Sequence, residues 1–297
     1  MLGRWPHEDR FERVTDMKKL IAGNWKMNGD TSSNAALLDA VLLGTAGLTG
    51  CDVLVCPPSL YAAAVVARLN GSAIAVGAQD VSTAEKGAYT GEISATMLRD
   101  IGVRYALVGH SERRQYHHET DALVGEKAQA ALSKGITPIV CVGETLAERE
   151  ADQTNAVVKR QLAAAIHAVG HCVSEIVVAY EPVWAIGTGQ TATPEQAQMV
   201  HAVIRAQLAA ATPNAEKVRI LYGGSVKPDN MAGLLAVPDV DGVLVGGASL
   251  DPLAFAAEFF SKLILNGQDQ PFFGEPLLLD HGRGGKERTL KRDALHA

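Results

Sequence analysis

Residues 219–247 read RILYGGSVKPDNMAGLLAVPDVDGVLVGG. This stretch contains two short apolar runs, Arg219–Tyr222 and Gly242–Val245, with a helical pattern between them, and a pair of glycines follows each run. Apolar runs without alternation are typical of strands that are buried on both faces of a parallel sheet. A helix between two such strands makes a β–α–β unit. Residues 219–247 therefore predict an α/β protein with parallel strands.

The same organisation extends through the rest of the chain. Six further apolar runs precede helical patterns, namely Lys19–Ala22, Asp52–Cys56, Ala73–Ala78, Tyr105–Val108, Thr137–Cys141 and Glu175–Tyr180. Thr145 with Glu148, and Thr193 with Gln196, fit the capping box that begins a helix. Eight successive strand–helix units favour a closed (β/α)8 barrel. Periodicity alone leaves an open doubly wound sheet as the alternative.

The chain ends differ in composition from the middle. The chain has 297 residues; residues 1–16 are rich in charge, and residues 269–297 are punctuated by Gly and Pro. Residues 17–268 have the length of one barrel, about 250 residues. We therefore predict a single barrel domain at 17–268, a C-terminal extension at 269–297, and an N-terminal extension at 1–16 that is disordered or not native, since Met17 resembles a native start.

Composition limits the class of partner. The formal net charge is −6, which argues against nucleic-acid binding and against attraction to anionic membranes. The four cysteines show no CxxC or CxxH spacing, and no apolar run is long enough to span a membrane. His167 and His171 are spaced to share one helical face, but no third ligand is near, so we predict no metal site. The sequence predicts a cytoplasmic protein.

Polar residues follow the apolar runs where a barrel would place its active site. The carboxyl ends of barrel strands open on one face, and that face carries the chemistry. A base, an imidazole, an ammonium group and two glycine pairs would meet there: Glu181, His110, Lys26 beside Asn24, Gly223-Gly224-Ser225 and Gly246-Gly247. Each residue alone is weak evidence, because strand ends are often simply solvated. Their convergence favours a functional site.

Two kinds of loop add to this site. Glycine lets successive backbone N–H groups approach a ligand closely, so the glycine pairs after the last two strands suit a phosphate group. The segment Pro182–Gly189 follows Glu181 directly, is apolar and ends in glycine. Its position predicts an exposed lid that excludes water from the site.

These residues resemble the triosephosphate isomerase family. The resemblance covers about residues 18–266 and rests on motifs in the family's order, namely Gly23–Gly29, Val108–Arg114, Cys141–Glu144, Ala179–Gly189, Tyr222–Val226 and Gly246–Leu250. One departure is Gln190, because the family often has a basic residue after the lid.

The resemblance implies a fold, a reaction and an assembly. It implies a TIM barrel that interconverts dihydroxyacetone phosphate and glyceraldehyde 3-phosphate through an enediolate, in glycolysis and gluconeogenesis, with no cofactor. It assigns Glu181 as the base, His110 as the electrophile, Asn24 and Lys26 to substrate binding, Glu112 beside Lys26, and the N–H groups of Gly187, Ser225, Gly246 and Gly247 to the phosphate. A long loop from Gln79 to Glu92 matches the loop through which the family forms homodimers, with Thr90 reaching the partner's site.

Three other functions remain open from the sequence. A barrel aldolase would use Lys26 as a Schiff-base nucleophile. A metal-dependent epimerase is disfavoured because the strand ends lack a His and Asp ligand set. A non-catalytic binding protein is disfavoured because Glu181, His110 and Lys26 are all retained. Fold alone would not choose among these functions.

Overall fold

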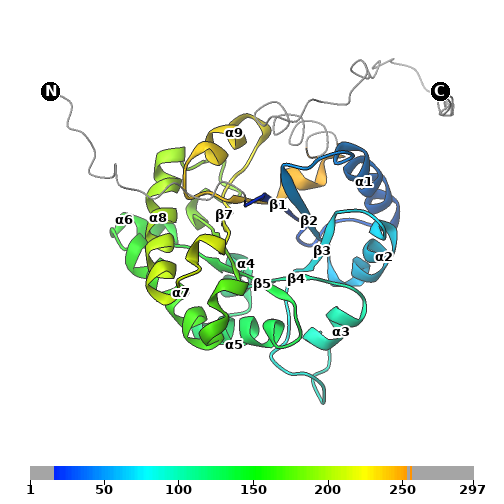
Figure 1. The fold of residues 1–297 in the computed structure, drawn as a ribbon, viewed down its shortest axis with the longest axis horizontal. Coiled ribbons are helices and arrows are strands. Elements are labelled where there is room, and N and C mark those ends of the chain that lie inside the picture. Colours follow the sequence, from blue (N-terminus) through cyan, green and yellow to red (C-terminus); the bar gives the residue numbers. More distant parts are fainter. Residues whose placement is uncertain (1–16, 253–254, 256–297) are drawn as a thin grey trace.

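The computed structural model describes residues 17–252 and Phe255. Its eight strands, counted over this described part, form a closed parallel barrel in the order of the sequence (Figure 1). The strands are β1 (Lys19–Asn24), β2 (Cys51–Cys56), β3 (Ala75–Ala78), β4 (Tyr105–Val108), β5 (Thr137–Val142), β6 (Val177–Tyr180), β7 (Ile220–Tyr222) and β8 (Gly242–Val245). The prediction of a closed barrel is confirmed, and the open sheet is excluded.

Helices surround the barrel on its outside (Figure 1). The α-helices are α1 (Thr31–Gly44), α2 (Ser59–Leu69), α3 (Ala95–Asp100), α4 (Ser111–Tyr116), α5 (Asp121–Leu132), α6 (Leu146–Glu150), α7 (Thr154–Val169), α8 (Pro194–Ala211) and α9 (Pro228–Ala236). Short 3-10 helices lie at η1 (Gly170–Glu175), η2 (Val183–Ala185), η3 (Ala215–Lys217) and η4 (Gly247–Leu250).

Several predicted element bounds were wrong. Strand β3 begins at Ala75 rather than Ala73, because the Ser72 hydroxyl accepts a hydrogen bond from the Ile74 N–H and turns the chain before the strand. Strand β6 begins at Val177, because Glu175 belongs to η1. Strand β7 begins at Ile220, one residue later than predicted, while β1 and β5 run further than predicted, to Asn24 and Val142.

His167 and His171 do not share one helical face as predicted. The backbone of Gly170 has φ +57° and ends α7, so His167 lies on α7 whereas His171 lies on η1. By contrast, the capping boxes at Thr145 and Thr193 are both present.

Strand side chains alternate between two hydrophobic cores. One core contains only strand residues and therefore fills the lumen of the barrel: Leu20, Ala22, Leu54, Cys56, Leu107, Ile139, Cys141, Val177, Ala179, Leu221 and Leu244. The intervening residues, such as Val178 and Tyr180, pack with helix residues such as Leu162 and Ile204 in the second core. Both faces of each strand are buried, which explains why the sequence shows no alternation.

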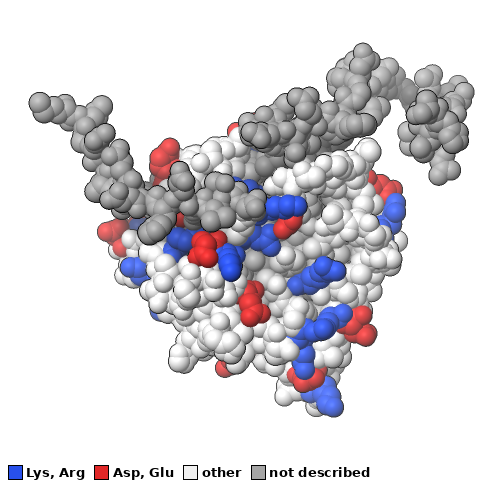
Figure 2. Space-filling view, in the orientation of Figure 1, with Lys and Arg blue, Asp and Glu red and all other residues white. Residues whose placement is uncertain are grey.

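Among the described residues, none of the helices has the length and apolar character needed to cross a bilayer. Basic and acidic side chains lie next to one another on the face drawn in Figure 2. The predicted extensions at 1–16 and 269–297 lie outside the described residues, as does most of the segment 253–268.

Candidate active site

A cavity of about 370 Å³ lies where the strands end on one face of the barrel. Its lining includes every residue predicted to be catalytic or to bind substrate: Asn24, Lys26, His110, Glu181, Gly187, Ser225, Gly246 and Gly247. Glu112 is not part of this lining but bonds to Lys26. Residues from five different strand ends therefore come together in one cavity, as the barrel geometry predicts.

The backbone of Glu181 is fixed by close contact between neighbouring strand ends. Because Tyr180 faces the outer core, the next side chain, Glu181, faces the mouth of the barrel. Its N–H donates to the carbonyl of Val142 at 2.7 Å. At Gly143 a Cβ would lie 1.7 Å from the Glu181 carbonyl oxygen, so only glycine allows this approach of β5.

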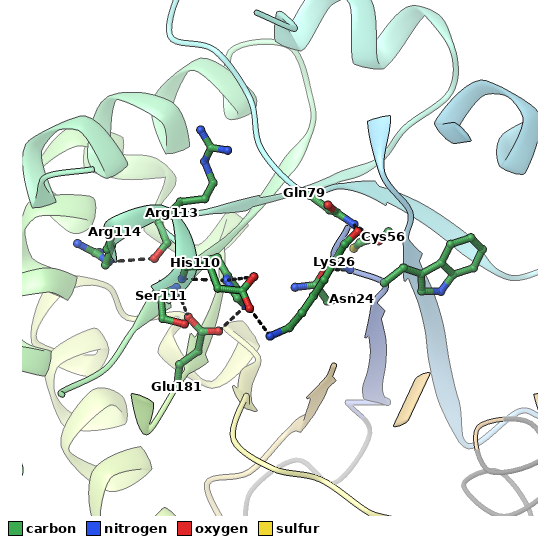
Figure 3. A network of polar contacts seen from close by, with 12 residues as sticks. Asn24, Lys26, Cys56, Gln79, His110, Ser111, Arg113, Arg114 and Glu181 are labelled. Atoms are coloured by element: carbon green, nitrogen blue, oxygen red, sulfur yellow. Dashed lines mark hydrogen bonds and ion pairs between the residues drawn. The ribbon is translucent and has the colours of Figure 1, made fainter. Parts of the chain in front are cut away.

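The carboxylate of Glu181 is almost fully buried, with 2% of the residue exposed. Its Oε1 lies 2.9 Å from Nε2 of His110, and its Oε2 accepts a hydrogen bond from the Ser111 N–H at 2.9 Å (Figure 3). The Ser111 contact was missed in the sequence, because a backbone donor leaves no signal in residue type. Both oxygens are therefore occupied by groups from the end of β4.

His110 caps the start of α4. The left-handed backbone of Gly109, with φ +69°, directs the chain into this position. The Glu112 N–H donates to Nδ1 of His110 at 3.3 Å, so Nδ1 is an acceptor and Nε2 carries the hydrogen directed at Glu181. Burial lowers the pKa of His110, but the carboxylates of Glu181 and Glu112 outweigh burial and raise the pKa above its usual value.

Lys26 supplies a positive charge to the site. Its backbone is left-handed, with φ +51°, and is held by the Gln79 amide, which donates to the Lys26 carbonyl at 2.8 Å. The Asn24 side chain accepts from the Lys26 N–H at 3.0 Å. The ammonium group donates to Glu112 at 2.5 Å. Gln79 was not predicted from sequence, since its role depends on the backbone of another strand end. Figure 3 shows Lys26 and Glu181 on either side of His110.

Glycine loops form another part of the cavity lining. Gly246 and Gly247 follow β8 directly, and η4 begins at Gly247. A Cβ on Gly247 would meet nothing within 4 Å, so its backbone is open to the cavity. At Gly224, by contrast, a Cβ would lie 2.2 Å from the Tyr222 hydroxyl oxygen, so the loop after β7 requires glycine.

The predicted lid is only partly exposed, which corrects the expectation of an exposed segment. Ala185 is fully buried and Trp184 is half-buried, with its indole N–H donating to Glu144 at 2.9 Å. The Arg149 guanidinium stacks over the Trp184 ring at 4.2 Å. Only the tip, residues 187–190, is exposed. The lid therefore has an anchored first half and an open tip that borders the cavity at Gly187.

A second cavity, of about 510 Å³, lies behind Glu181 and Ser111. Two guanidinium groups in its lining, those of Arg114 and Arg160, both pair with Asp121. Each guanidinium group thus already has an acidic partner within the protein, and we assign this cavity no ligand. Among residues 17–252, no group of three or more His, Cys, Asp or Glu side chains is arranged to hold a metal ion.

Comparison with known proteins decides the family. A family model described as "Triosephosphate isomerase" matches residues 19–263. The chain belongs to the triosephosphate isomerase family. Curated triosephosphate isomerases from Paracidovorax citrulli, Delftia acidovorans and Albidiferax ferrireducens are similar to it. They are 68%, 67% and 66% identical over 235, 238 and 233 residues, covering 78%, 80% and 78% of this chain and 94%, 96% and 94% of theirs.

Membership of the triosephosphate isomerase family settles the activity. At this level of identity the chain is an aldose–ketose isomerase of glycolysis built on a TIM barrel, with triosephosphate isomerase activity. The aldolase, the epimerase and the non-catalytic protein that the sequence left open are thereby excluded.

Proposed function

We propose that Glu181, His110 and Lys26 are the residues that interconvert dihydroxyacetone phosphate and D-glyceraldehyde 3-phosphate. The observation that carries this proposal is the contact between Glu181 and His110 in a cavity bordered by Lys26 and the glycine loops. The cavity thus contains a base, a hydrogen-bond donor and a cation within reach of one small phosphorylated substrate.

In the proposed first step, the Glu181 carboxylate removes a proton from the carbon next to the substrate carbonyl. The electron pair of the C–H bond becomes the new C=C bond, and the carbonyl oxygen gains negative charge. His110 Nε2–H donates a hydrogen bond to that oxygen, and Lys26 stabilises the same charge electrostatically. After the proton moves between the two oxygens through His110, Glu181 returns its proton to the neighbouring carbon. The isomerisation needs no redox cofactor, because no external electrons are exchanged.

This mechanism requires an exchange of partners. The Nε2–H of His110 that would reach the substrate oxygen donates to Glu181 in the structure. Substrate binding would therefore replace Glu181 with the substrate oxygen. Once Glu181 holds a proton, its carboxylate no longer raises the pKa of His110. Burial and Lys26 then lower this pKa, opposed by Glu112 alone. His110 then acts as a neutral donor, which matches an enediolate oxygen.

The substrate phosphate would lie on the backbone N–H groups of Gly187, Ser225, Gly246 and Gly247. All four residues line the same cavity as Glu181 and His110. A phosphate held there would fix the reacting carbons relative to the base, which converts binding energy into orientation. Binding at Gly187 would also draw the exposed tip of the lid over the site.

Substitution of single residues tests these roles. Glu181→Gln removes the base at constant size, and His110→Gln removes the imidazole; each should lower kcat about 10²–10⁴-fold. Lys26→Met should raise KM and lower kcat. Glu216→Gln, an exposed carboxylate in η3, is the matched control and should leave both constants unchanged. A coupled assay with glyceraldehyde 3-phosphate measures all four variants. Full activity in Glu181→Gln would overturn the proposal.

We also propose that the protein is a homodimer that uses the loop 79–92. Figure 1 shows this loop projecting from the barrel next to α3, and its residues 85–92 are exposed. Its base is pinned by a hydrogen bond from the Ser82 N–H to the carbonyl of Ile93 at 2.9 Å. A long loop with a fixed base and an exposed tip is suited to a partner.

An apolar surface beside this loop supports the same assembly. Met27 and Leu60 are 95% and 83% exposed. They lie near the loop base, because Gln79 bonds to the Lys26 carbonyl and the Tyr61 hydroxyl to the Gly29 carbonyl. The partner's Tyr89 and Thr90 would cover this surface, and Thr90 would then approach Asn24 and Glu112. Light scattering at micromolar concentration should give twice the protomer mass; a fully active monomer would contradict the proposal.

We also propose the bounds of the barrel domain and the location of the protein in the cell. A single barrel domain at 17–268 agrees with the family match over residues 19–263. A cytoplasmic location is supported by the role of triosephosphate isomerases in glycolysis. Cell fractionation of the tagged full chain measures this location.

A further inference from the structure

Two tyrosines at the ends of neighbouring strands each connect to one end of the lid. Tyr180 and Tyr222 are register partners in β6 and β7. The Tyr180 hydroxyl donates to Glu144 at 3.1 Å, and Glu144 also accepts the indole N–H of Trp184 at the start of the lid. The Tyr222 hydroxyl accepts the N–H of Ala192, just after the lid, at 3.3 Å. Both ends of the lid thus rest on one pair of rings.

The same two tyrosines directly precede the proposed site. Tyr180 is followed by Glu181, and Tyr222 is followed by the glycine loop that reaches Ser225. Both rings point into the outer core, away from the substrate cavity, where they approach each other with centroids 6.5 Å apart. Their orientation therefore affects the lid and the backbone of the base without contact with substrate.

A third ring, that of His201 on α8, packs against both tyrosines. Its centroid lies 5.9 Å from that of Tyr180, edge to face at 85°, and 6.5 Å from that of Tyr222. Such edge-on contacts between rings favour particular orientations. His201 is completely buried, and its Nδ1 lies 3.0 Å from the carbonyl oxygen of Asp239, which fixes the rotation of the ring.

Stability alone does not account for a histidine at this position. Nε2 of His201 is buried and, among the described residues, has no hydrogen-bond partner. A buried polar nitrogen without a partner lowers stability, so an apolar ring would pack at least as well. What bears on the two tyrosines is the ring of His201, which packs against both of them.

We propose that His201 is a positioning residue for the isomerisation. Its ring sets the orientation of Tyr180 and Tyr222, and through them the position of both lid ends and of Glu181. This inference rests on the proposed roles of Glu181 and the lid. His201 touches neither the substrate cavity nor the lid itself, so it acts entirely through the two tyrosines.

A matched pair of variants separates the ring from simple packing. His201→Phe retains a ring, whereas His201→Met fills similar volume without one, and both lose the bond to the Asp239 carbonyl. Because small misplacements of reacting groups cost up to about 10²-fold in rate, we expect kcat to fall about tenfold in His201→Met and to stay within about threefold in His201→Phe. A poorly closed lid would let the enediolate expel its phosphate and form methylglyoxal. The share of turnover that ends as methylglyoxal should therefore rise only in His201→Met, while KM changes little.

Two controls complete the experiment. Leu208→Ala removes a buried side chain two turns further along α8 and should lower the urea midpoint without changing kcat or product partition. Glu181→Gln is assayed in parallel, because its failure to lose activity would overturn the proposed function itself. If His201→Met does not fold, His201→Gln is a second ringless variant with the same expected result.

The outcomes are distinct. A tenfold loss of kcat in the ringless variant, with the ring variant near the parent, supports positioning by His201. Equal kcat in His201→Met, Leu208→Ala and the parent would show that His201 only packs, and would overturn the proposal. An equal loss in His201→Met and His201→Phe would overturn it as well, because the ring would not be the decisive feature.

Discussion

Oε1 of Glu181 lies 2.9 Å from Nε2 of His110, so the base and the electrophile of the proposed mechanism are bonded to each other. Each of these groups must therefore release the other before it can act on substrate. The carboxylate has to move toward the reacting carbon, while the imidazole remains fixed at the start of α4 by the Glu112 N–H. The length of the Glu181 side chain determines whether that movement reaches the carbon.

Shortening this side chain is expected to slow the reaction without altering its products. Glu181→Asp withdraws the carboxylate by about 1 Å, which we expect to lower kcat roughly 10²-fold. The lid and the phosphate loops stay intact, so the share of turnover that ends as methylglyoxal should be unchanged. Parallel assays of isomerisation and of inorganic phosphate release measure both quantities. A rise in phosphate release would show that Glu181 also controls the fate of the enediolate.

Removing the tip of the lid should change the products of the reaction as well as its rate. A bound phosphate held by the Gly187 N–H would keep the bridging C–O bond in the plane of the enediolate, where phosphate cannot be expelled. Deleting Ile186–Thr188 should lower isomerisation by several orders of magnitude, because orientation and electrostatic stabilisation each contribute several kcal/mol. The methylglyoxal share should rise at the same time. If both routes slowed equally, the lid would serve binding only.

Substitution of Gly143 at the end of β5 tests whether the backbone position of Glu181 matters for catalysis. In Gly143→Ala the new Cβ would lie 1.7 Å from the Glu181 carbonyl oxygen, so the backbone of the base has to shift. We expect kcat to fall about 10²-fold, together with a lower urea midpoint. Gly233→Ala on α9 is the matched control, since its Cβ would make an ordinary contact of 3.4 Å with Pro194. Comparable kcat in the two variants would contradict this assignment.

Buried His201 should make stability depend on pH. Burial, the largest influence, lowers the pKa of His201 from 6.5 to about 4, against a smaller opposing effect of Asp239, while Arg205 and Lys19 lower it further. Between pH 6.5 and 4 the unfolded chain binds a proton at His201 and the folded protein does not. The free energy of unfolding therefore falls by about 1.4 kcal/mol per pH unit as the pH decreases through this range.

The His201→Phe variant isolates this effect. It lacks the titrating group, so the difference in unfolding free energy between parent and variant should depend on pH between 6.5 and 4 and be constant above 7. Urea unfolding at pH 7, 6 and 5, at one protein concentration, measures the difference. A difference that is constant over the whole range would mean that His201 is protonated to the same extent in both states.

The two chain extensions should be dispensable for catalysis. The family match ends at residue 263 and begins at residue 19, so residues 1–16 and 269–297 lie beyond it. A chain limited to residues 17–268 should retain kcat within a few-fold of the full chain in the coupled assay. A collapse of turnover in this variant would assign the extensions a role in folding or assembly.

The sequence predicted the strands and the side chains of the site more reliably than it predicted how loops and turns hold them. All eight apolar runs are strands, because burial on both faces imposes a composition that is visible locally. Glu181 and His110 were found because they follow such runs. The bond of Trp184 to Glu144 was not predicted, since it joins the lid to a carboxylate at the end of a different strand. His167 and His171 were wrongly placed on one helix, because the left-handed Gly170 between them was not recognised.

The alternation along β6 separates two kinds of control. Ala179 faces the lumen, Tyr180 faces the helices, and Glu181 faces the mouth. Adjacent residues on one strand therefore contact different parts of the protein. Glu181 lines the substrate cavity, whereas Tyr180 packs against the helices and bonds to Glu144, which also holds Trp184 of the lid. If His201 positions Tyr180, a substitution on α8 displaces the lid and Glu181 together. Such a substitution lies outside the substrate cavity, so every atom that lines the cavity keeps its identity.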